Sequence, residues 1–475
     1  MTVHRIRVGA ATLGLIFLAG CAVGPDYKRP EIDKPEPVDA EAALAHQRQL
    51  ADWWQRFDDP TLDALIERAA SDNLEIRSAV ARMAEAQARL GLASAERRPT
   101  VGAQAEASRE RTPATAFPID LPGAGATTAN TFSVVGALDW EIDLWGRLAR
   151  EREAALATLD QSRHAHDALR LAITTEVAHG YFALLAAEQQ LRITERTLAS
   201  RQSTLELEQI RFDAGETDEL AFRQAQAQLE TTRAQLPARR AQVRHLEGVL
   251  AVLVGMSPNE LSGTIDFENG SIRELTLPEL HVDELPASLI ERRPDIRAAE
   301  AGLTAANAAI GIAEAARLPA LSLGAMLGSI ARDESDLLSS GATAWSGGAS
   351  LFGPVLDFGR SRSRIDTAEA MREQAELSWR ATVQIAFNEV RSAMITLESA
   401  TETIAAVERQ VEVIARTEEL AEIRYREGLV GFIELLDARR NLLEAELALS
   451  EARREQLTAA ATLFKALGGG WSERK

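Results

Sequence analysis

Two carboxylates near the C-terminus, Glu434 and Asp437, are spaced so that their negative charges could act together. Residues three apart lie on one side of a helix, so the two side chains would form a single acidic patch. Like charges this close repel, and they need nearby arginine side chains or bound cations as compensation. Arg424, Arg439 and Arg440 are the nearest candidates in the sequence. The alternative is that both acids are ordinary solvated charges on a helix surface.

No other grouping in the sequence predicts catalysis or metal binding. The seven histidines show no metal-motif spacing, and His164 and His166, two residues apart, would point to different sides of a helix. No Ser/His/Asp arrangement, phosphate-binding glycine loop or tuned carboxylate pair is recognisable. We therefore expect no catalytic residue, no metal ligand and no cofactor.

The only cysteine, Cys21, stands where a lipid could be attached. Basic residues precede a short apolar segment at 8–19, which is the order of a secretory signal and is too short for a membrane helix. The end of that segment, Leu-Ala-Gly-Cys at 18–21, resembles the lipobox of bacterial lipoproteins, in which the cysteine becomes the acylated (palmitate-bearing) first residue. Ala22 follows instead of the aspartate that tends to retain lipoproteins at the inner membrane. The alternative is an ordinary signal peptide followed by a stray thiol.

Composition favours long helices and argues against nucleic acid as a partner. The 475 residues carry a net charge of −19, which becomes −21 once residues 1–20 are removed, whereas phosphate binding needs a basic face. Alanine, leucine, glutamate, arginine and glutamine dominate, and only 5% of residues are aromatic. Four prolines between 22 and 52 predict an extended tether. No other stretch reaches the roughly 18 consecutive apolar residues of a membrane helix, so any spanning segment would have to be a strand.

The elements that would position these residues are long helices with a seven-residue repeat. A helix is predicted over 146–212, and some 67 residues of helix span roughly 100 Å. A strict heptad repeat keeps one seam facing a partner helix and imposes a left-handed supercoil. The seam residues are Val177, Leu184, Leu191, Leu198, Leu205 and Phe212.

The chain is one unit written twice. Residues 76–101 align without gaps on 296–321, a shift of 220, and Gly146 aligns with Gly359, a shift of 213 that persists to Gly215 and Gly428. Each repeat is predicted to contain a helix, two strands, a long helix, a turn and a shorter helix. The turns fall at 211–217 and 424–430, at the far end of the long helices from the strands.

Alternating apolar residues predict two strands in each repeat. They lie at about 100–108, 131–140, 320–328 and 345–353, and each is about as long as a tilted strand that crosses a bilayer. Four strands cannot close a barrel, and an open sheet edge in hydrocarbon is costly, so the chain must oligomerise. Two copies would supply eight strands and three would supply twelve, a choice that these arguments leave open.

Several motifs resemble the TolC-type outer-membrane efflux proteins, in the lipidated, NodT-like branch that serves resistance-nodulation-division pumps. These motifs are Gly24-Pro25-Asp26-Tyr27, Trp53-Trp54, Phe57-Asp58-Asp59-Pro60-Thr61-Leu62, Leu289-Ile290-Glu291-Arg292-Arg293-Pro294-Asp295-Ile296 and Tyr425-Arg426-Glu427-Gly428. The resemblance implies a mixed membrane α+β fold: a homotrimer with a twelve-stranded outer-membrane β-barrel, four strands from each chain, continued by a periplasmic α-helical barrel of coiled-coil hairpins. It also implies a passive exit duct for small molecules, anchored in outer-membrane lipid and joined to a periplasmic adaptor protein and an inner-membrane pump.

The resemblance also implies roles for particular residues. Glu434 and Asp437 match an acidic constriction at the periplasmic mouth. The two turns match the tips that contact the adaptor, through Ala214, Gly215, Glu216, Glu427, Gly428 and Leu429. Trp53 and Trp54 are expected to pack in an equatorial belt rather than bind a ligand. Two alternative functions remain, an outlet for secreted proteins and a structural coiled-coil lipoprotein without a pore, although a structural tether would have no use for membrane-length hairpins.

These observations predict the following organisation of the chain. Residues 1–20 are the signal peptide, 21–57 the lipid-anchored tether and equatorial segment, 58–265 the first repeat, 266–284 an equatorial linker, 285–467 the second repeat and 468–475 a C-terminal tail.

Overall fold

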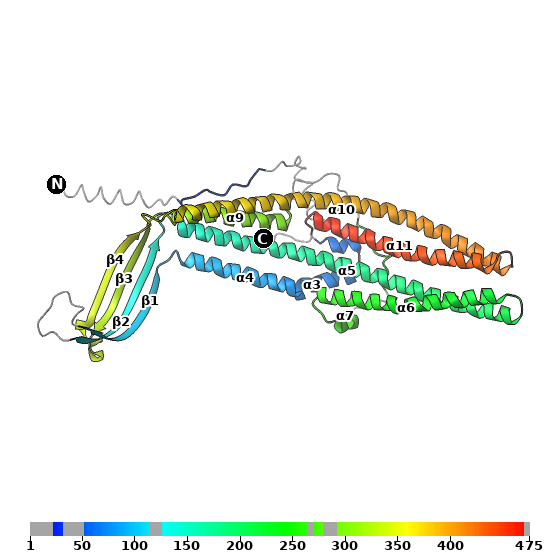
Figure 1. Cartoon of the computed structure of the whole chain (residues 1–475), viewed down its shortest axis with the longest axis horizontal. Coiled ribbons are helices and arrows are strands. Elements are labelled where there is room, and N and C mark those ends of the chain that lie inside the picture. Colours follow the sequence, from blue (N-terminus) through cyan, green and yellow to red (C-terminus); the bar gives the residue numbers. More distant parts are fainter. Residues whose placement is uncertain (1–21, 32–51, 114–125, 265–269, 279–291, 470–475) are drawn as a thin grey trace. The chain divides into compact units, whose positions relative to one another are not determined.

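The computed structural model of the chain describes residues 22–31, 52–113, 126–264, 270–278 and 292–469. The chain forms two compact units, whose residues can be found by the sequence colours of Figure 1. Unit 1 comprises residues 1–31, 83–162 and 299–379, and unit 2 comprises residues 32–82, 163–298 and 380–475. Because the long helices pass from one unit into the other along the sequence, each unit contains parts of both repeats.

The described elements follow the predicted order in both repeats. The strands are β1 (Thr100–Thr112), β2 (Thr127–Ile142), β3 (Ala320–Ala331) and β4 (Thr343–Phe352). The helices are η1 (Trp53–Phe57), α3 (Pro60–Asp72), α4 (Leu74–Ala95), α5 (Arg147–Asp213), α6 (Glu219–Leu253), α7 (Pro258–Thr264), α9 (Pro294–Ala315), η3 (Glu334–Asp336), η4 (Ser340–Ala342), α10 (Arg360–Arg426) and α11 (Phe432–Ala466).

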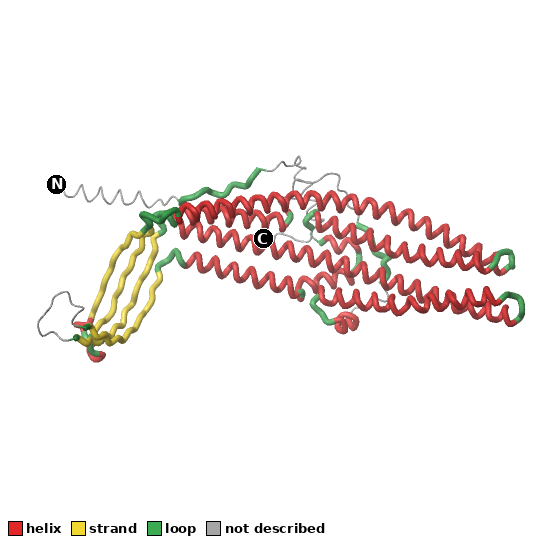
Figure 2. Tube along the Cα trace, viewed as in Figure 1, coloured by secondary structure: helices red, strands yellow, loops and turns green. Residues whose placement is uncertain are grey.

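Unit 1 contains one antiparallel sheet in the order β1-β2-β3-β4 (Figure 2). All four predicted strands are present, but β1, β2 and β3, with 13, 16 and 12 residues, are longer than the 9–10 residues expected. The extra pairs involve polar residues, such as Thr112 with Thr127 and Arg109 with Asn130. The prediction stopped too early because these residues break the apolar alternation without preventing ladder hydrogen bonds.

The register of the sheet reproduces the two sequence shifts. Val101 pairs with Leu138 in the first hairpin, and Leu321 pairs with Leu351 in the second. The first members of these pairs differ by 220 and the second members by 213, the shifts found between the repeats. The sheet therefore consists of two equivalent hairpins, joined where β2 pairs with β3.

The helices are duplicated in length as well. The long helices α5 and α10 both have 67 residues, and the returning helices α6 and α11 both have 35. Pro237 lies inside α6, and the helix continues through it. None of the helices in the described part of the chain combines the length and the apolar character needed to cross a membrane.

The core of unit 2 is built on aromatic side chains, as expected for the tryptophan pair. Trp53 and Trp54 are 0% and 5% exposed, and the Trp53 ring stacks on Phe464 with 5.4 Å between ring centroids. Phe57 packs against Phe182 at 5.1 Å. Residues from the start of the chain, α5 and α11 are thereby joined in one hydrophobic cluster, and this fixes the segment before α3 on the long helices.

Candidate functional site

The sequence predicts an extended tether at 22–31. In the structure this segment is extended and packs against α5 and α9, within unit 1. Arg150 on α5 is 5% exposed, and its guanidinium donates to the carbonyls of Val23 and Gly24 and to the Asp26 carboxylate. Asn307 on α9 donates to the Pro25 carbonyl at 2.8 Å. These residues are extended, as predicted, and α5 and α9 satisfy their main-chain groups. We call residues 22–31 the strap.

The far end of the strap is held by one carboxylate. Arg29 makes two hydrogen bonds of 2.6 Å with Glu300 on α9, and the Tyr27 hydroxyl donates to the same side chain at 3.1 Å. Burial and the adjacent Glu300 charge raise the pKa of Tyr27 to about 12, so its phenol remains a donor at physiological pH. A two-point contact of arginine with carboxylate fixes both position and direction.

Two glycines allow the strap to approach α9 closely. Gly24 has a φ of +96°, which disfavours other residues, and a Cβ on it would lie 2.5 Å from the Gly311 Cα. A Cβ on Gly311 would lie 2.8 Å from the Val23 carbonyl oxygen. The strap and α9 therefore touch backbone to backbone, and a methyl group on either glycine would separate them.

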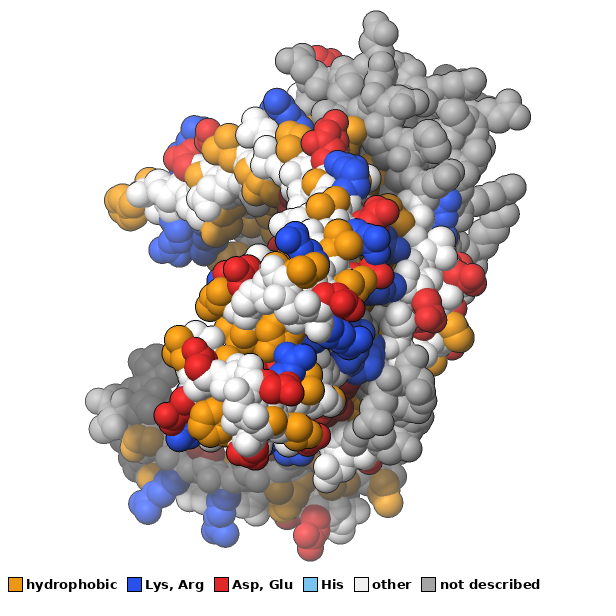
Figure 3. Space-filling model, turned by 90° about the vertical axis from the view of Figure 1, so that its right-hand side faces the viewer, with side chains coloured by type: hydrophobic (Ala, Val, Ile, Leu, Met, Phe, Trp, Pro, Cys, Tyr) orange, Lys and Arg blue, Asp and Glu red, His pale blue; other side chains and the backbone are white. Residues whose placement is uncertain are grey.

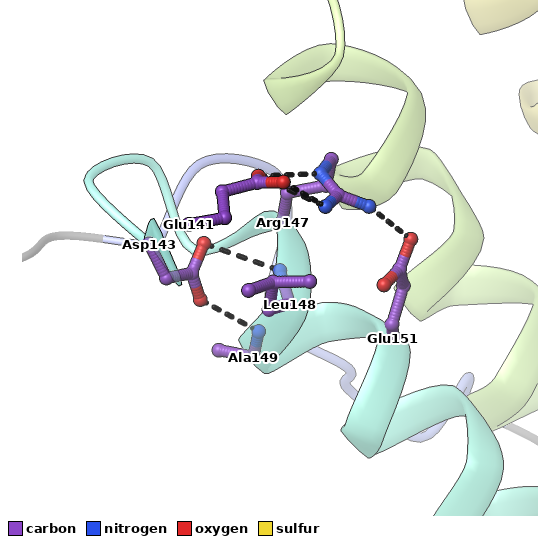
Figure 4. Close-up of polar contacts among 6 residues, drawn as sticks. All are labelled: Glu141, Asp143, Arg147, Leu148, Ala149 and Glu151. Carbon is purple, nitrogen blue, oxygen red and sulfur yellow. Dashed lines mark hydrogen bonds and ion pairs between the residues drawn. The ribbon is translucent and has the colours of Figure 1, made fainter. Parts of the chain in front are cut away.

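A network of charged side chains joins β2 to α5 (Figure 4). Arg147 binds Glu141 through both carboxylate oxygens and binds Glu151, one helical turn away, at 2.6 Å. Asp143 caps the helix by accepting from the backbone N–H groups of residues 148 and 149, at 3.1 and 2.8 Å. Since one side chain bonds to both the strand and the helix, the strand enters the helix at a defined angle.

The junction of β4 with α10 lacks this arginine clamp. Asp357 caps α10 in the same way, accepting from the backbone N–H groups of Gly359 and Ser361. However, Pro354 occupies the position that corresponds to Glu141, so the strand offers no carboxylate. Several apolar side chains around this junction are exposed instead: Phe352, Val355, Leu356 and Phe358.

The two helix-reversing turns, in unit 2, are built alike. In each, a glycine has a left-handed backbone, with φ of +73° at Gly215 and +69° at Gly428. The N–H that follows each glycine bonds back five residues, from Glu216 to Arg211 and from Leu429 to Arg424, both at 2.8 Å. Nothing lies within 4 Å of a Cβ built on either glycine. Substitution there would strain the turn without creating an internal clash.

The surface around the turns is mixed in character. Figure 3 views the right-hand side of Figure 1, where both turns lie, and shows acidic, basic and hydrophobic side chains interspersed on that face. Leu429 is 67% exposed directly after Gly428, and Ala214, Gly215, Glu216 and Glu427 are also exposed.

Glu434 and Asp437 are both exposed in the first turns of α11. Of the three compensating arginines proposed from the sequence, Arg440 binds Asp437 at 3.0 Å. Arg439 instead turns to Glu418 and Glu422 on α10, at 3.1 and 3.3 Å. The Asp437 carboxylate is therefore partly neutralised within the chain.

A contact near the turns that the sequence analysis missed joins α5 to α10. The Tyr425 hydroxyl donates to Glu208 at 2.6 Å, and Glu208 is 0% exposed. The Arg211 guanidinium lies over the Tyr425 ring, 5.1 Å from its centroid. Burial, reinforced by the hydrogen bond and charge of Glu208, raises the pKa of Tyr425 to about 12. The helical hairpin of α5 and α6 is thereby linked to the helical hairpin of α10 and α11 through one buried carboxylate.

The candidate site is therefore a set of contacts that hold the strap, the strand-to-helix junctions and the turns in place. Within the described residues, no three acidic, histidine or cysteine side chains come together as a metal site would require. Cys21, the expected lipid attachment residue, lies outside the described part of the chain.

Comparison with known proteins decides the family. The family model of the outer membrane efflux protein matches residues 65–256 and 285–469, one stretch in each repeat. This chain belongs to the outer membrane efflux protein family. The pyoverdine export outer membrane protein OpmQ of Pseudomonas putida is 33% identical over 90% of this chain and 89% of its own. Nodulation protein T of Rhizobium leguminosarum is 30% identical over 99% of this chain and 95% of its own.

Structural comparison agrees. The solved outer-membrane channel OprN superposes with a TM-score of 0.84 at 32% identity, covering 95% of this chain and all of that one. The resemblance to the NodT-like efflux proteins, the fold class with four strands per chain and two repeats, and the outer-membrane localisation are confirmed. So is the function as an outer-membrane efflux duct that works with an adaptor and an inner-membrane pump. Members of this family are channel proteins.

Proposed function

We propose that three copies of this efflux protein close one twelve-stranded barrel and conduct small molecules passively from an adaptor and pump to the outside, without catalysis. The observation that carries this proposal is the pair of edge strands. In the described sheet, β1 pairs only with β2 and β4 only with β3. Each edge therefore presents unpaired backbone groups, which cost several kcal/mol each in hydrocarbon. A ring of copies removes both edges.

The equivalence of the two hairpins predicts how the copies pair. Inside the chain, Leu138 on β2 lies opposite Ala325 on β3. The repeat shifts convert this pair into Leu351 on β4 and Ala105 on β1 of the next copy. The same conversion places Ala349 opposite Ala107. The closing contact thus has a defined register that can be tested.

The strand-to-helix junctions support the same closure. Inside the chain, the Trp145 indole N–H donates to the Pro319 carbonyl at 2.8 Å. The corresponding residues are Phe358 and, in the next copy, Pro99. Phe358 is 92% exposed and has a φ of +52°, an unusual combination for an aromatic residue. A neighbouring copy would cover it.

Cysteine crosslinking tests the closure. In a Leu351→Cys/Ala105→Cys variant, mild oxidation should link copies into covalent trimers, because each chain supplies one partner to each neighbour. The control is Leu351→Cys/Glu106→Cys, since residue 106 points to the other face of the sheet. Covalent dimers as the largest product would indicate an eight-stranded pair instead, and equal yields in both variants would refute the register.

Cargo is proposed as small molecules because OpmQ is named for export of pyoverdine, which is a small molecule. The test is intracellular accumulation of a set of dyes and antibiotics in cells with and without the gene. A secretion outlet would instead change the proteins in the medium, and a structural lipoprotein would change neither and show no conductance in planar bilayers.

Individual roles complete the proposal. Cys21 carries the lipid, Glu434 and Asp437 narrow the periplasmic mouth, and the turns at Gly215 and Gly428, with their flanking residues, contact the adaptor. The repeats are proposed to occupy 58–265 and 285–467. The exposed, open turns and the exposed acidic pair support these assignments.

A further inference from the structure

The repeat shift relates the contact between α5 and α11 inside each chain to an equivalent pair of helices, which could meet between copies. Four interactions run along this seam in unit 2. Ser450 donates to the Ala186 carbonyl at 3.2 Å, and Arg196 binds both carboxylate oxygens of Glu446 at 2.7 Å. Arg439 donates to Thr204 at 2.6 Å, and Thr462 lies 3.2 Å from the His179 ring nitrogen.

The repeat shift of 213 converts this seam into one between α10 and α6. The corresponding pairs, with the α10 residue first, are Ser399 with Pro237, Arg409 with Arg233, Thr417 with Gln226, and Ser392 with Val249. All eight of these residues are exposed, whereas all of their counterparts except Arg196 are partly or fully buried. Such a difference is expected if the second seam forms only with a neighbouring copy.

A groove marks the place where the neighbour would fit. It lies between α10 and α11, has a volume of about 730 Å³ and is lined mostly by small residues. Ser392 and Ser399, two of the positions that the repeat shift assigns to the seam, line it. Inside the chain, buried residues of α5, α6 and α11 belong to one hydrophobic cluster. Small side chains allow a helix to approach closely, as the seam requires.

The two seams differ in charge at one level. Inside the chain, Arg196 faces Glu446, an attractive pair. Between copies, Arg409 would face Arg233, and no described side chain forms an ion pair with Arg409. Arg233 already binds Glu230 on its own helix at 2.6 Å, so that carboxylate is engaged. A like-charge pair at a seam weakens it.

We propose that α6 of a second copy occupies the α10/α11 groove, and that the opposed arginines Arg409 and Arg233 make this seam the weak one in each assembly. The proposal rests on the closure into a ring described above. It predicts that the helical part separates between copies before the two hairpins of one chain separate, since only the seam inside the chain has an ion pair.

Charge exchange tests the proposal. Either Arg233→Glu or Arg409→Glu alone should turn the like pair into an opposite pair and slow trimer dissociation in detergent. Exposed pairs typically change such equilibria about two- to fivefold, and three seams act together, so roughly ten- to a hundredfold is expected for the trimer. The double variant, with two glutamates, should return to the parent rate or faster. Added salt should speed dissociation of the single variants relative to the parent. It screens the attraction of the Arg–Glu pair in the single variants, and it screens the repulsion of the Arg–Arg pair in the parent.

The control is Arg391→Glu, which changes the charge of α10 equally from an exposed position outside the groove. If it slows dissociation as much as Arg409→Glu, net charge is the cause and the proposed pairing is wrong. If the two single variants and the double variant have additive effects, the two arginines do not meet. Should Leu351→Cys/Ala105→Cys still give covalent trimers in that case, closure of the ring stands and only this seam is refuted.

Discussion

The buried link between the hairpins, Tyr425 to Glu208, makes a quantitative prediction. Replacing Tyr425 with phenylalanine removes one hydroxyl and leaves the ring, with its Arg211 and Phe432 contacts, in place. Glu208 is 0% exposed, and its second carboxylate oxygen makes no hydrogen bond in the described structure. Hydrogen bonds to charged groups contribute about 1.5–3 kcal/mol each, so the hairpin contact should weaken by about ten- to a hundredfold per chain.

The expected result is a wider, less stable mouth. In planar bilayers, channels of the Tyr425→Phe variant should show higher conductance or more frequent openings than the parent. Glu208→Gln should have a smaller effect, because an amide still accepts from the tyrosine and carries no buried charge. The double variant Glu208→Gln/Tyr425→Phe should fall well short of the sum of the single effects. Additive single effects would show that the two groups do not interact, and an unchanged conductance in all three would refute a role for this link in holding the mouth closed.

Four further predictions concern the same chain. Burial raises the pKa of the Tyr425 phenol to about 12. The stabilisation from its hydrogen bond to Glu208 is therefore fully present below about pH 10 and should be lost as the pH rises through about 12. The conductance of the parent channel should rise in that window, whereas the conductance of Tyr425→Phe should not. The Glu434→Ala/Asp437→Ala variant should gain conductance and lose cation preference, and unchanged values for both would place the gate elsewhere. Gly428→Val forces a β-branched residue into a left-handed turn, a strain of about 1–3 kcal/mol, and should abolish site-specific crosslinks to the adaptor while trimers persist. Cys21→Ser should incorporate no labelled fatty acid and still assemble; label retained in that variant would refute acylation at this residue.

The sequence predicted what repetition and periodicity encode. Heptads and two constant shifts located the long helices, the turns and the four strands, because these depend on local patterns. The contacts of the strap could not be predicted, because its proline-rich composition says nothing of its partners. Arg150 holds it mostly through backbone carbonyls, and the Gly24–Gly311 approach joins residues almost 300 positions apart. The Tyr425–Glu208 link was missed for a related reason, since a heptad seam shows that a helix has a partner but not which helix or which rotamer.

The docked strap changes what the expected lipid would do. Ala22 lies against Gly146, the residue before α5, and adjacent Cα atoms are only about 3.8 Å apart, so a lipid on Cys21 would begin one peptide bond from a residue held at the start of α5. Acyl chains attached there would move less than acyl chains at the end of a flexible segment. They would anchor the start of α5 at the membrane surface. Inserting a few flexible residues after Cys21 would keep the lipid attached but would no longer hold the start of α5 next to it. The effect of lipid attachment could then be separated from the effect of helix position.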